Sequence, residues 1–321
     1  MPIRSHILST GSYLPERIMT NADLEKIVET SNEWIFQRSG IKRRHIAADN
    51  ESTSDMAIKA ASQALERSGL KAQDIDGVIL ATTTPDQTFP AVAVKVQAAL
   101  DIPAGIAFDV QAVCTGFIYA LSTADNFIKN GQLKNVLVIG AEKMSSVLNW
   151  EDRTTCVLFG DGAGAIVLQG QESEGNSGIY STHLYADGKM RDLLYTDGGV
   201  STTGKSGHIV MQGREVFKNA VNLMAAAVND ALEENNISAA EIDWLVPHQA
   251  NSRIIESTAK KLGFSMDKVI MTVDHHGNTS AASIPLAFDE AVTKGDIKKG
   301  DMVLFEALGG GLTWGSALAR F

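Results

Sequence analysis

The sequence has few cysteines, no long apolar run and a shortage of positive charge. Two cysteines in 321 residues exclude a disulfide framework and indicate a reducing, cytoplasmic setting. No apolar stretch is long enough to span a bilayer, and the first residues, MPIRSHILSTGSYLP, do not resemble a signal peptide. The 28 Lys and Arg are outnumbered by 38 Asp and Glu, and the formal net charge of −10 argues against nucleic acid and membrane as partners.

Short strand-like runs alternate with helical patterns along the chain, which is typical of an α/β protein. The hydrophobic content of 44% supports a large core at this length. Helices are predicted over residues 54–68 and 214–235, and the polar stretch 185–212 is predicted to be a surface excursion or lid. Strands are predicted at Val78–Ala81, Ala107–Val110, Val136–Ile139, Ala165–Leu168, Trp244–Val246, Val269–Val273 and Met302–Phe305.

The sequence also repeats itself. The segment ALERSGLKAQDIDGVILATT, from Ala64, aligns without a gap with ALEENNISAAEIDWLVPHQA, from Ala231. Further along, DNFIKNGQLKNVLVIGA, from Asp125, matches DEAVTKGDIKKGDMVLFEA, from Asp289. Two halves of similar plan are therefore predicted, covering residues 1–170 and 171–321.

The repeat relates the positions of three residues with useful chemistry. Cys114, in QAVCTGF, and Asn278, in HGNTSAAS, occupy equivalent loop-to-helix junctions, whereas His248, in LVPHQAN, follows a strand in the second half only. Loops at the carboxyl ends of strands share one rim of a sheet, so these three side chains could converge. A helix start would stabilise a Cys114 thiolate.

Simpler explanations exist for each of these residues. Cys114 could be a small core residue, His248 a hydrogen-bonded loop histidine, and Asn278 a plain helix N-cap. Cys156 lies in an apolar run, TTCVLFG, and is predicted to belong to the core.

Two glycine-rich stretches and a histidine pair were also candidates for binding. FGDGAGA, at 159–165, lacks the G-x-G-x-x-G spacing and leads into a strand, which argues against dinucleotide binding. LGGGLTWG, at 308–315, follows a strand and could direct backbone N–H groups at an oxyanion, or could be only a tight turn. His275 and His276 suggest a metal only weakly, because no cysteine or carboxylate cluster adjoins them in the sequence.

Taken together, QAVCTGF, GDGAGA, WLVPHQAN, HHGNTSAAS and LGGGLTWGSAL closely resemble the β-ketoacyl-acyl carrier protein synthase III family, the initiating condensing enzymes of bacterial type II fatty acid synthesis. The resemblance implies an α/β, thiolase-like fold in which two duplicated halves form a five-layer αβαβα sandwich, and a homodimer. It also implies decarboxylative condensation of a short acyl-CoA, acetyl-CoA above all, with malonyl-acyl carrier protein. The products would be 3-oxoacyl-acyl carrier protein, CO₂ and CoA, formed through an acyl-Cys intermediate without metal or organic cofactor.

By the same resemblance, individual residues acquire roles. Cys114, His248 and Asn278 would form the catalytic triad, and the N–H groups of Cys114 and Gly310 the oxyanion hole. The residues that match the coenzyme A site are Trp34, Arg38, Arg153, Gly213 and Phe217. Phe89, reaching across the dimer, and Leu308 would shape the acyl pocket. A surface for the acidic carrier protein is predicted at Arg214, Lys218, Gln249, Ala250, Asn251, Ser252 and Arg253.

Two departures from the family pattern, Leu308 where Phe is frequent and His275 where another polar residue is common, leave the primer acyl group open. The nearest rival is a related acyl-transferring or polyketide-priming synthase that takes another primer. A papain-like protease also uses Cys, His and Asn in this order, but its C-G-S-C-W signature is missing here. A non-catalytic acyl-binding homologue is a third alternative, and the intact triad argues against it.

Overall fold

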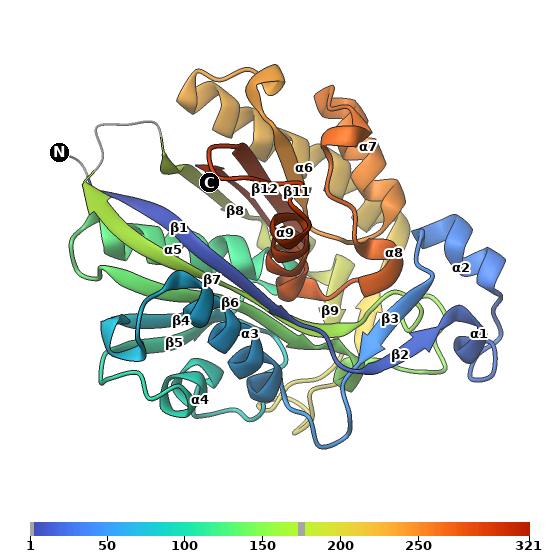
Figure 1. The fold of residues 1–321 in the computed structure, drawn as a ribbon. Helices are drawn as coiled ribbons and strands as arrows, with labels where there is room; N and C mark the ends of the chain where they lie inside the picture. The colour runs from blue at the N-terminus through green and yellow to red at the C-terminus, as the bar shows by residue number, and fades with distance from the viewer. Residues whose placement is uncertain (1–2, 173–176) are drawn as a thin grey trace.

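The structure is a computed structural model that describes residues 3–172 and 177–321. Two β-sheets alternate with three layers of helices (Figure 1). The first sheet has the strand order β1 (Ile3–Tyr13), β7 (Asp161–Glu172), β6 (Asn135–Lys143), β4 (Gly77–Ala81) and β5 (Ile106–Val110). The second has the order β11 (Trp244–Pro247), β12 (Met302–Gly309), β13 (Thr313–Arg320) and β8 (Gly178–Ala186).

The helices form an outer, a middle and a second outer layer (Figure 1). The first sheet is covered on its outer face by α3 (Thr53–Ser68) and α4 (Val92–Ala99). Between the sheets lie α5 (Gly116–Lys129) and α9 (Ser283–Lys294), and the second sheet is covered by α6 (Gly213–Asn235) and α7 (Ser252–Leu262). This confirms the predicted αβαβα sandwich, and the helices predicted over 54–68 and 214–235 lie within one residue of the observed bounds.

Smaller elements surround this sandwich. The hairpin of β2 (Arg17–Thr20) and β3 (Arg43–Ile46) carries the short helices α1 (Asn21–Leu24) and α2 (Asn32–Ser39) in its loop. A second hairpin, β9 (Leu194–Thr196) and β10 (Ile209–Met211), lies in the stretch predicted to be an excursion. Helix α8 (Val273–His276) precedes α9. No helix of the described residues is long and apolar enough to cross a membrane.

The two sheets repeat one pairing pattern. In the first, β1 pairs antiparallel with β7, β7 antiparallel with β6, and β6 parallel with β4. In the second sheet, β8 pairs antiparallel with β13, β13 antiparallel with β12, and β12 parallel with β11. This symmetry accounts for the repeat in the sequence, although the predicted junction at residue 170 lies inside β7.

The predicted strand at Val269–Val273 is wrong. Only Val269 bridges to β11, at the position that β5 takes in the first sheet. The reason is the buried Gln249 side chain, which donates to the carbonyl of Ile270 at 3.0 Å and accepts from the N–H groups of Thr272 and Val273. An amide side chain thus satisfies backbone groups that a neighbouring strand would otherwise pair.

The middle layer is the most apolar part of the chain. Helix α5 buries Phe117, Ile118, Leu121 and Ile128 against both sheets, as the apolar spacing predicts. Fully burying each such side chain stabilises the fold by roughly 1.5–3 kcal/mol. A helix held on two sides in this way gives the residue before it a fixed position.

Candidate active site

Cys114 lies in a 3₁₀ turn, Val113–Thr115, immediately before α5. Its side chain is buried, and the preceding Val113 has a positive φ of 51°, which is costly for a β-branched residue. The hydroxyl of Thr115 donates to the carbonyl of Thr313 at 3.0 Å. Gly309 lies so close that a Cβ there would come within 2.8 Å of the Cys114 nitrogen. The turn is therefore held in a strained shape by the end of β12 and the start of β13.

Burial raises the pKa of the Cys114 thiol to about 12, although the Ser280 hydroxyl acts in the opposite direction; the nearby Glu142 carboxylate adds to the increase. The thiol is therefore protonated at neutral pH. The sequence predicted a thiolate stabilised by the helix start, and in the structure burial outweighs that effect.

His248 follows β11 and is also buried. Its N–H donates to the carbonyl of Glu306 at 2.8 Å, and its ring Nδ1 lies 2.6 Å from the Ser283 hydroxyl at the start of α9. Burial lowers the pKa of the imidazole to about 3, so the ring is neutral at physiological pH.

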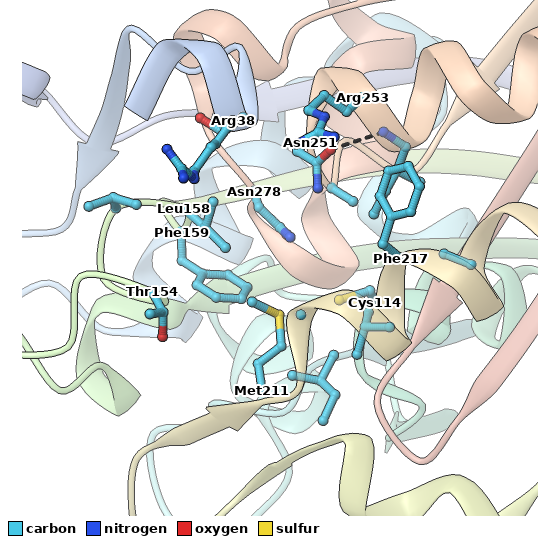
Figure 2. A pocket seen from close by; sticks show the side chains of 18 of the residues that line it. Arg38, Cys114, Thr154, Leu158, Phe159, Met211, Phe217, Asn251, Arg253 and Asn278 are labelled. Carbon is cyan, nitrogen blue, oxygen red and sulfur yellow. Dashed lines mark hydrogen bonds between the residues drawn. The ribbon is translucent and has the colours of Figure 1, made fainter. Parts of the chain in front are cut away.

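Asn278 follows α8, and its side chain points into the cavity near Cys114 (Figure 2). Its Oδ1 accepts from the N–H of Ser280 at 2.9 Å. The N-cap alternative is not confirmed, because Thr279 is the N-cap residue of the 3₁₀ turn Ser280–Ala282 and Asn278 lies one residue before it. With the oxygen engaged, the amide NH₂ is left as the donor that faces the cavity.

The three side chains share one cavity of about 580 Å³. Leu308 and Phe217 also line this cavity, and Figure 2 shows Phe217 beside Cys114 and Asn278. The sequence therefore predicted correctly that residues from separate loops converge. The arrangement offers a nucleophile beside a neutral imidazole and a side-chain amide, without a group that titrates near pH 7.

A smaller cavity of about 120 Å³ also reaches Cys114. It is lined by Thr83, Gln111, Val113, Met144, Val147, Phe159, Leu194, Tyr195, Thr196 and Ile209. Sequence reasoning missed this pocket, because its walls come from the β9–β10 hairpin and from the segments that follow β4, β5 and β6 and precede β7. The hairpin loop 199–206 is mostly exposed, as predicted, but the strands on either side of it contribute apolar residues to the site.

Two backbone N–H groups near the thiol have no carbonyl partner among the described residues, those of Cys114 and Gly310. A Cβ at Gly310 would come within 2.7 Å of the Leu194 carbonyl oxygen and 3.5 Å of the Val113 side chain. Neither group is thus engaged by a backbone carbonyl of the described chain, and the oxyanion hole that the resemblance implies stays a prediction.

The far end of the large cavity is aromatic and basic. Trp34 and Arg38 lie on its rim. The Arg38 guanidinium lies 4.4 Å from the centre of the Trp34 ring, and that of Arg153 lies 5.2 Å from it. Arg153 also donates to the carbonyl of Glu29 at 2.9 Å. A flat aromatic ligand could replace either guanidinium on this ring.

Residues predicted to contact a carrier protein divide into two groups. Arg214, Lys218 and Arg253 are exposed on α6 and α7, and Ala250, Asn251 and Ser252 are half-buried beside them. Gln249 is wrong as a contact residue, because its side chain is fully buried and bonded to the backbone around Ile270. Gly213 is exposed and lines the large cavity.

Phe89 lines neither cavity at Cys114, and 80% of its surface is exposed. A single chain therefore does not use it to close the acyl pocket. Whether Phe89 closes the acyl pocket of a second copy in a dimer stays a prediction. Cys156 is fully buried, in agreement with its assignment to the core.

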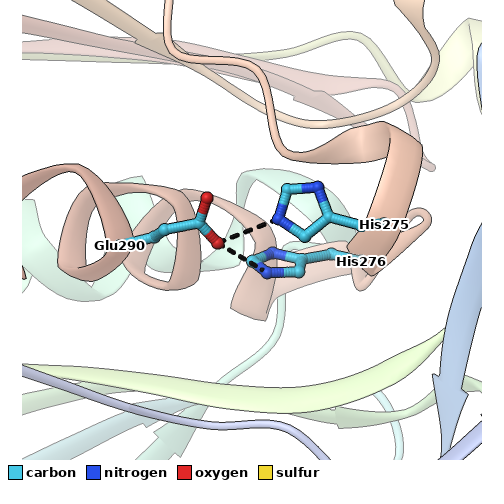
Figure 3. Close-up of side chains that lie close together, drawn as sticks. All are labelled: His275, His276 and Glu290. Atoms are coloured by element: carbon cyan, nitrogen blue, oxygen red, sulfur yellow. Dashed lines mark hydrogen bonds and ion pairs between the residues drawn. The ribbon is translucent and has the colours of Figure 1, made fainter. Parts of the chain in front are cut away.

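Within the described ranges, His275, His276 and Glu290 bring side-chain atoms that could bind a metal ion to within 4.8 Å of one another (Figure 3). A Glu290 oxygen lies 2.9 Å from His275 Nε2 and 3.0 Å from His276 Nε2. Lys294 pairs with the other carboxylate oxygen at 2.5 Å, and Asp274 with His275 Nδ1 at 2.6 Å. These hydrogen bonds and ion pairs hold α8 against α9 and account for the cluster, which ends two residues before Asn278.

Comparisons with known proteins agree with this geometry. Models described as 3-oxoacyl-[acyl-carrier-protein (ACP)] synthase III and as its C terminal match residues 108–188 and 232–321. The β-ketoacyl-[acyl-carrier-protein] synthase III of Rhodospirillum centenum is 62% identical over 323 residues, with 100% of both chains covered.

Solved structures give the same result. The 3-oxoacyl-[acyl-carrier-protein] synthase III of Aquifex aeolicus VF5 matches with a TM-score of 0.94 and 50% identity, covering 99% of this chain and 100% of that one. The priming β-ketosynthase of the R1128 polyketide pathway matches with a TM-score of 0.93 and 33% identity, covering 99% and 97%. The fold is the thiolase-like fold.

Proposed function

This chain belongs to the β-ketoacyl-[acyl-carrier-protein] synthase III family of condensing enzymes of fatty acid synthesis, and we propose that it joins a short acyl-CoA to malonyl-acyl carrier protein with loss of CO₂. The observation that carries the proposal is the shared cavity of Cys114, His248 and Asn278. A nucleophile beside two neutral donors suits a reaction that needs a stabilised enolate more than proton transfer.

In the first step the Cys114 sulfur attacks the acyl-CoA thioester. The thiol proton leaves with CoA as CoA–SH, and the acyl group stays on the sulfur. The tetrahedral oxyanion would be held by the N–H groups of Cys114 and Gly310, which have no carbonyl partner in the described chain. Removing one such donor typically costs about 3–4 kcal/mol of transition-state stabilisation.

We propose that the CoA arm lies in the large cavity, which leads from Cys114 to Trp34 and Arg38. The adenine ring would stack on Trp34 in place of one guanidinium, and the freed arginine would face the phosphates. Gly213, with no side chain, and Phe217 would lie along the arm.

In the second step malonyl-acyl carrier protein loses CO₂, and the electrons of the broken C–C bond form an enolate. The enolate oxygen would accept from His248 Nε2 and from the Asn278 amide. Both groups are anchored on their other side, by Ser283 and Ser280, so they would require little reorganisation. The enolate carbon then attacks the acyl-Cys114 carbonyl, and the Cys114 sulfur leaves as 3-oxoacyl-acyl carrier protein forms.

The small cavity supports a short primer, acetyl-CoA above all, because it encloses only about 120 Å³. We propose that a second copy of the chain completes this pocket with Phe89. The exposure of Phe89 and the unpaired edge of β5 within the described sheet support a homodimer on this side. Both cysteines are free, which supports the expected cytoplasmic setting.

Under this proposal the two halves divide the work. Residues 1–170 supply the nucleophile, and residues 171–321 supply His248 and Asn278. The middle helices bring them together, because α5 begins just after Cys114 and α9 begins at Ser283.

The proposal is tested by intact-protein mass spectrometry after mixing with a panel of acyl-CoAs, followed by assay of CO₂ release from malonyl-acyl carrier protein. One acetyl group should appear on Cys114 and disappear when the malonyl substrate is added. A thioester label that persists in Cys114→Ser would show that another residue carries the acyl group.

The alternative is a polyketide-priming synthase with another primer, favoured by the likeness to the R1128 enzyme. The same panel separates the two, because a priming synthase would prefer a primer other than acetyl. The fold argues against a papain-like protease, since full-length relatives share the thiolase-like architecture.

A further inference from the structure

Ser283 makes an unusual pair of contacts with the active-site histidine loop. Its hydroxyl oxygen lies 2.6 Å from His248 Nδ1 and accepts the backbone N–H of Gln249 at 3.3 Å. Ser283 and His248 are both buried, at 1% and 2% exposure. Solvent therefore does not supply alternative partners for either group.

The hydrogen-bond count at this hydroxyl decides the direction of the contact. A serine hydroxyl has one proton and two lone pairs. Within residues 3–172 and 177–321, Oγ has no acceptor in reach other than His248 Nδ1. If Nδ1 carried a proton and donated it, the serine proton would be left buried without an acceptor, which is unfavourable.

From this count we propose that Ser283 is a positioning residue that donates to Nδ1 and thereby holds His248 in the tautomer with its proton on Nε2. The inference deepens the proposed function, on which it rests. Within the described chain the His248 ring makes its side-chain hydrogen bond through Nδ1, which leaves Nε2 without a partner, and the ring lines the cavity. The Nε2 proton is then available to a thioester oxygen in every resting molecule.

The position of Ser283 in the fold keeps its hydroxyl fixed relative to the His248 ring. It is the first residue of α9, which is buried between the two sheets. Asn278 lies on the same segment, and its oxygen is held by the N–H of Ser280. One short segment, residues 278–283, thus orients both donors that would face the enolate.

The first test is a spectroscopic one that does not depend on the reaction. Protein labelled with ¹⁵N-histidine is examined by NMR at pH 7, and His248 is assigned by loss of its signals in His248→Ala. We expect a neutral ring with the proton on Nε2. A ring protonated on Nδ1 in the wild-type protein overturns the inference, whatever the enzyme's substrates are.

The second test compares Ser283→Ala with Ser283→Thr, which keeps a hydroxyl. Ser283→Ala should place part of the His248 population in the Nδ1–H tautomer and lower CO₂ release by about tenfold. Acetylation of Cys114 should stay within about twofold, and Ser283→Thr should restore both the tautomer and the rate. Equal rates in the two variants would overturn the role, provided both unfold near the wild-type temperature.

A failure of the proposed function looks different from a failure of this inference. If the wild-type protein forms no 3-oxoacyl product, the function is wrong, while the NMR result still decides the tautomer.

Discussion

The Asn278 side-chain oxygen accepts a hydrogen bond from the Ser280 backbone N–H at 2.9 Å, and this contact decides which end of the amide faces the cavity. The Ser280 hydroxyl in turn donates to the buried Glu142 carboxylate at 3.1 Å. Glu142 belongs to β6 of the first sheet and also accepts from Thr84. The orientation of a donor in the second half is thus anchored in the first.

This relationship predicts different outcomes for two substitutions of Asn278. Asn278→Ala removes the donor and should lower condensation by about 10²-fold or more. Asn278→Asp keeps the shape and the contact with Ser280, but places an acceptor where the enolate needs a donor. We expect Asn278→Asp to be at least as damaged as Asn278→Ala.

The measurement separates the half-reactions, with CO₂ release for condensation and intact mass for acylation. Acylation of Cys114 should survive in both variants. Equal losses in both half-reactions would contradict a role confined to decarboxylation.

Glu306 provides a test of pH dependence. It is fully buried in β12, both of its carboxylate oxygens lack a partner within the described residues, and burial raises its pKa to about 8. Between the unfolded value near 4.5 and this raised value, the folded chain holds the proton more tightly than the unfolded chain. The contribution of Glu306 to stability therefore falls as the pH rises through this window.

Glu306→Gln removes this titration. Its stability relative to wild type should increase from pH 5 to pH 8.5, by an amount on the order of a few kcal/mol. Urea unfolding at the two pH values measures this, with Glu256→Gln, exposed on α7, as the control. Parallel pH profiles for wild type and Glu306→Gln would contradict the argument.

Three exposed cations, two of which line the large cavity, give a third prediction. Arg214, Lys218 and Arg253 have no carboxylate within ion-pair distance in the described chain, although the net charge is −10. Arg253→Glu should raise the apparent KM for an acidic carrier-protein substrate about fivefold or more at low salt, and less at high salt. Lys71→Glu, exposed on the other side of the molecule, should leave KM unchanged.

Acetyl-CoA acylation serves as the internal reference for this prediction. Because Arg253 also lines the large cavity, the KM for acetyl-CoA is measured in the same variant, and we expect the KM for the carrier-protein substrate to rise more than the KM for acetyl-CoA. A KM for the carrier-protein substrate that matches wild type would exclude Arg253 from the interface.

The sequence predicted most of the fold because apolar periodicity reports burial directly. Helices α3 and α6 and strand β4 lie close to their predicted bounds. It failed at Val269–Val273 and at Gln249 for one shared reason, the side-chain amide that bonds the backbone of residues 270–273. The residues around Gln249 in the sequence do not predict a contact with a segment about twenty residues away.

The sequence predicted the residues that converge at the site but not all the walls of its pockets. Cys114, His248 and Asn278 share a cavity as the repeat suggested, since equivalent loops lie on related rims. The walls of the small pocket were missed, because Leu194 and Ile209 lie in a polar stretch and only the hairpin fold turns them inward.

The last prediction concerns the length of the primer. An acyl chain on Cys114 gains about 0.8 kcal/mol for each buried CH₂ if space exists. Where space is exhausted, overpacking costs roughly 1–3 kcal/mol and cancels the gain. The small cavity beside Cys114 holds about 120 Å³, and Met144, Val147 and Ile209 are among the apolar residues that line it. Acylation rates should therefore fall steeply from acetyl-CoA to octanoyl-CoA.

Two variants identify the wall that sets this limit. Met144→Ala enlarges the pocket within one chain and should raise octanoyl transfer relative to acetyl transfer. Phe89→Ala should have a similar effect only if a second copy places Phe89 at the pocket end, because Phe89 lies outside the pocket of its own chain. Leu308 lines the large cavity instead, so Leu308→Ala serves as the control and should leave the chain-length profile in place. A wild-type preference for octanoyl-CoA would contradict the size argument and favour a synthase with a different primer.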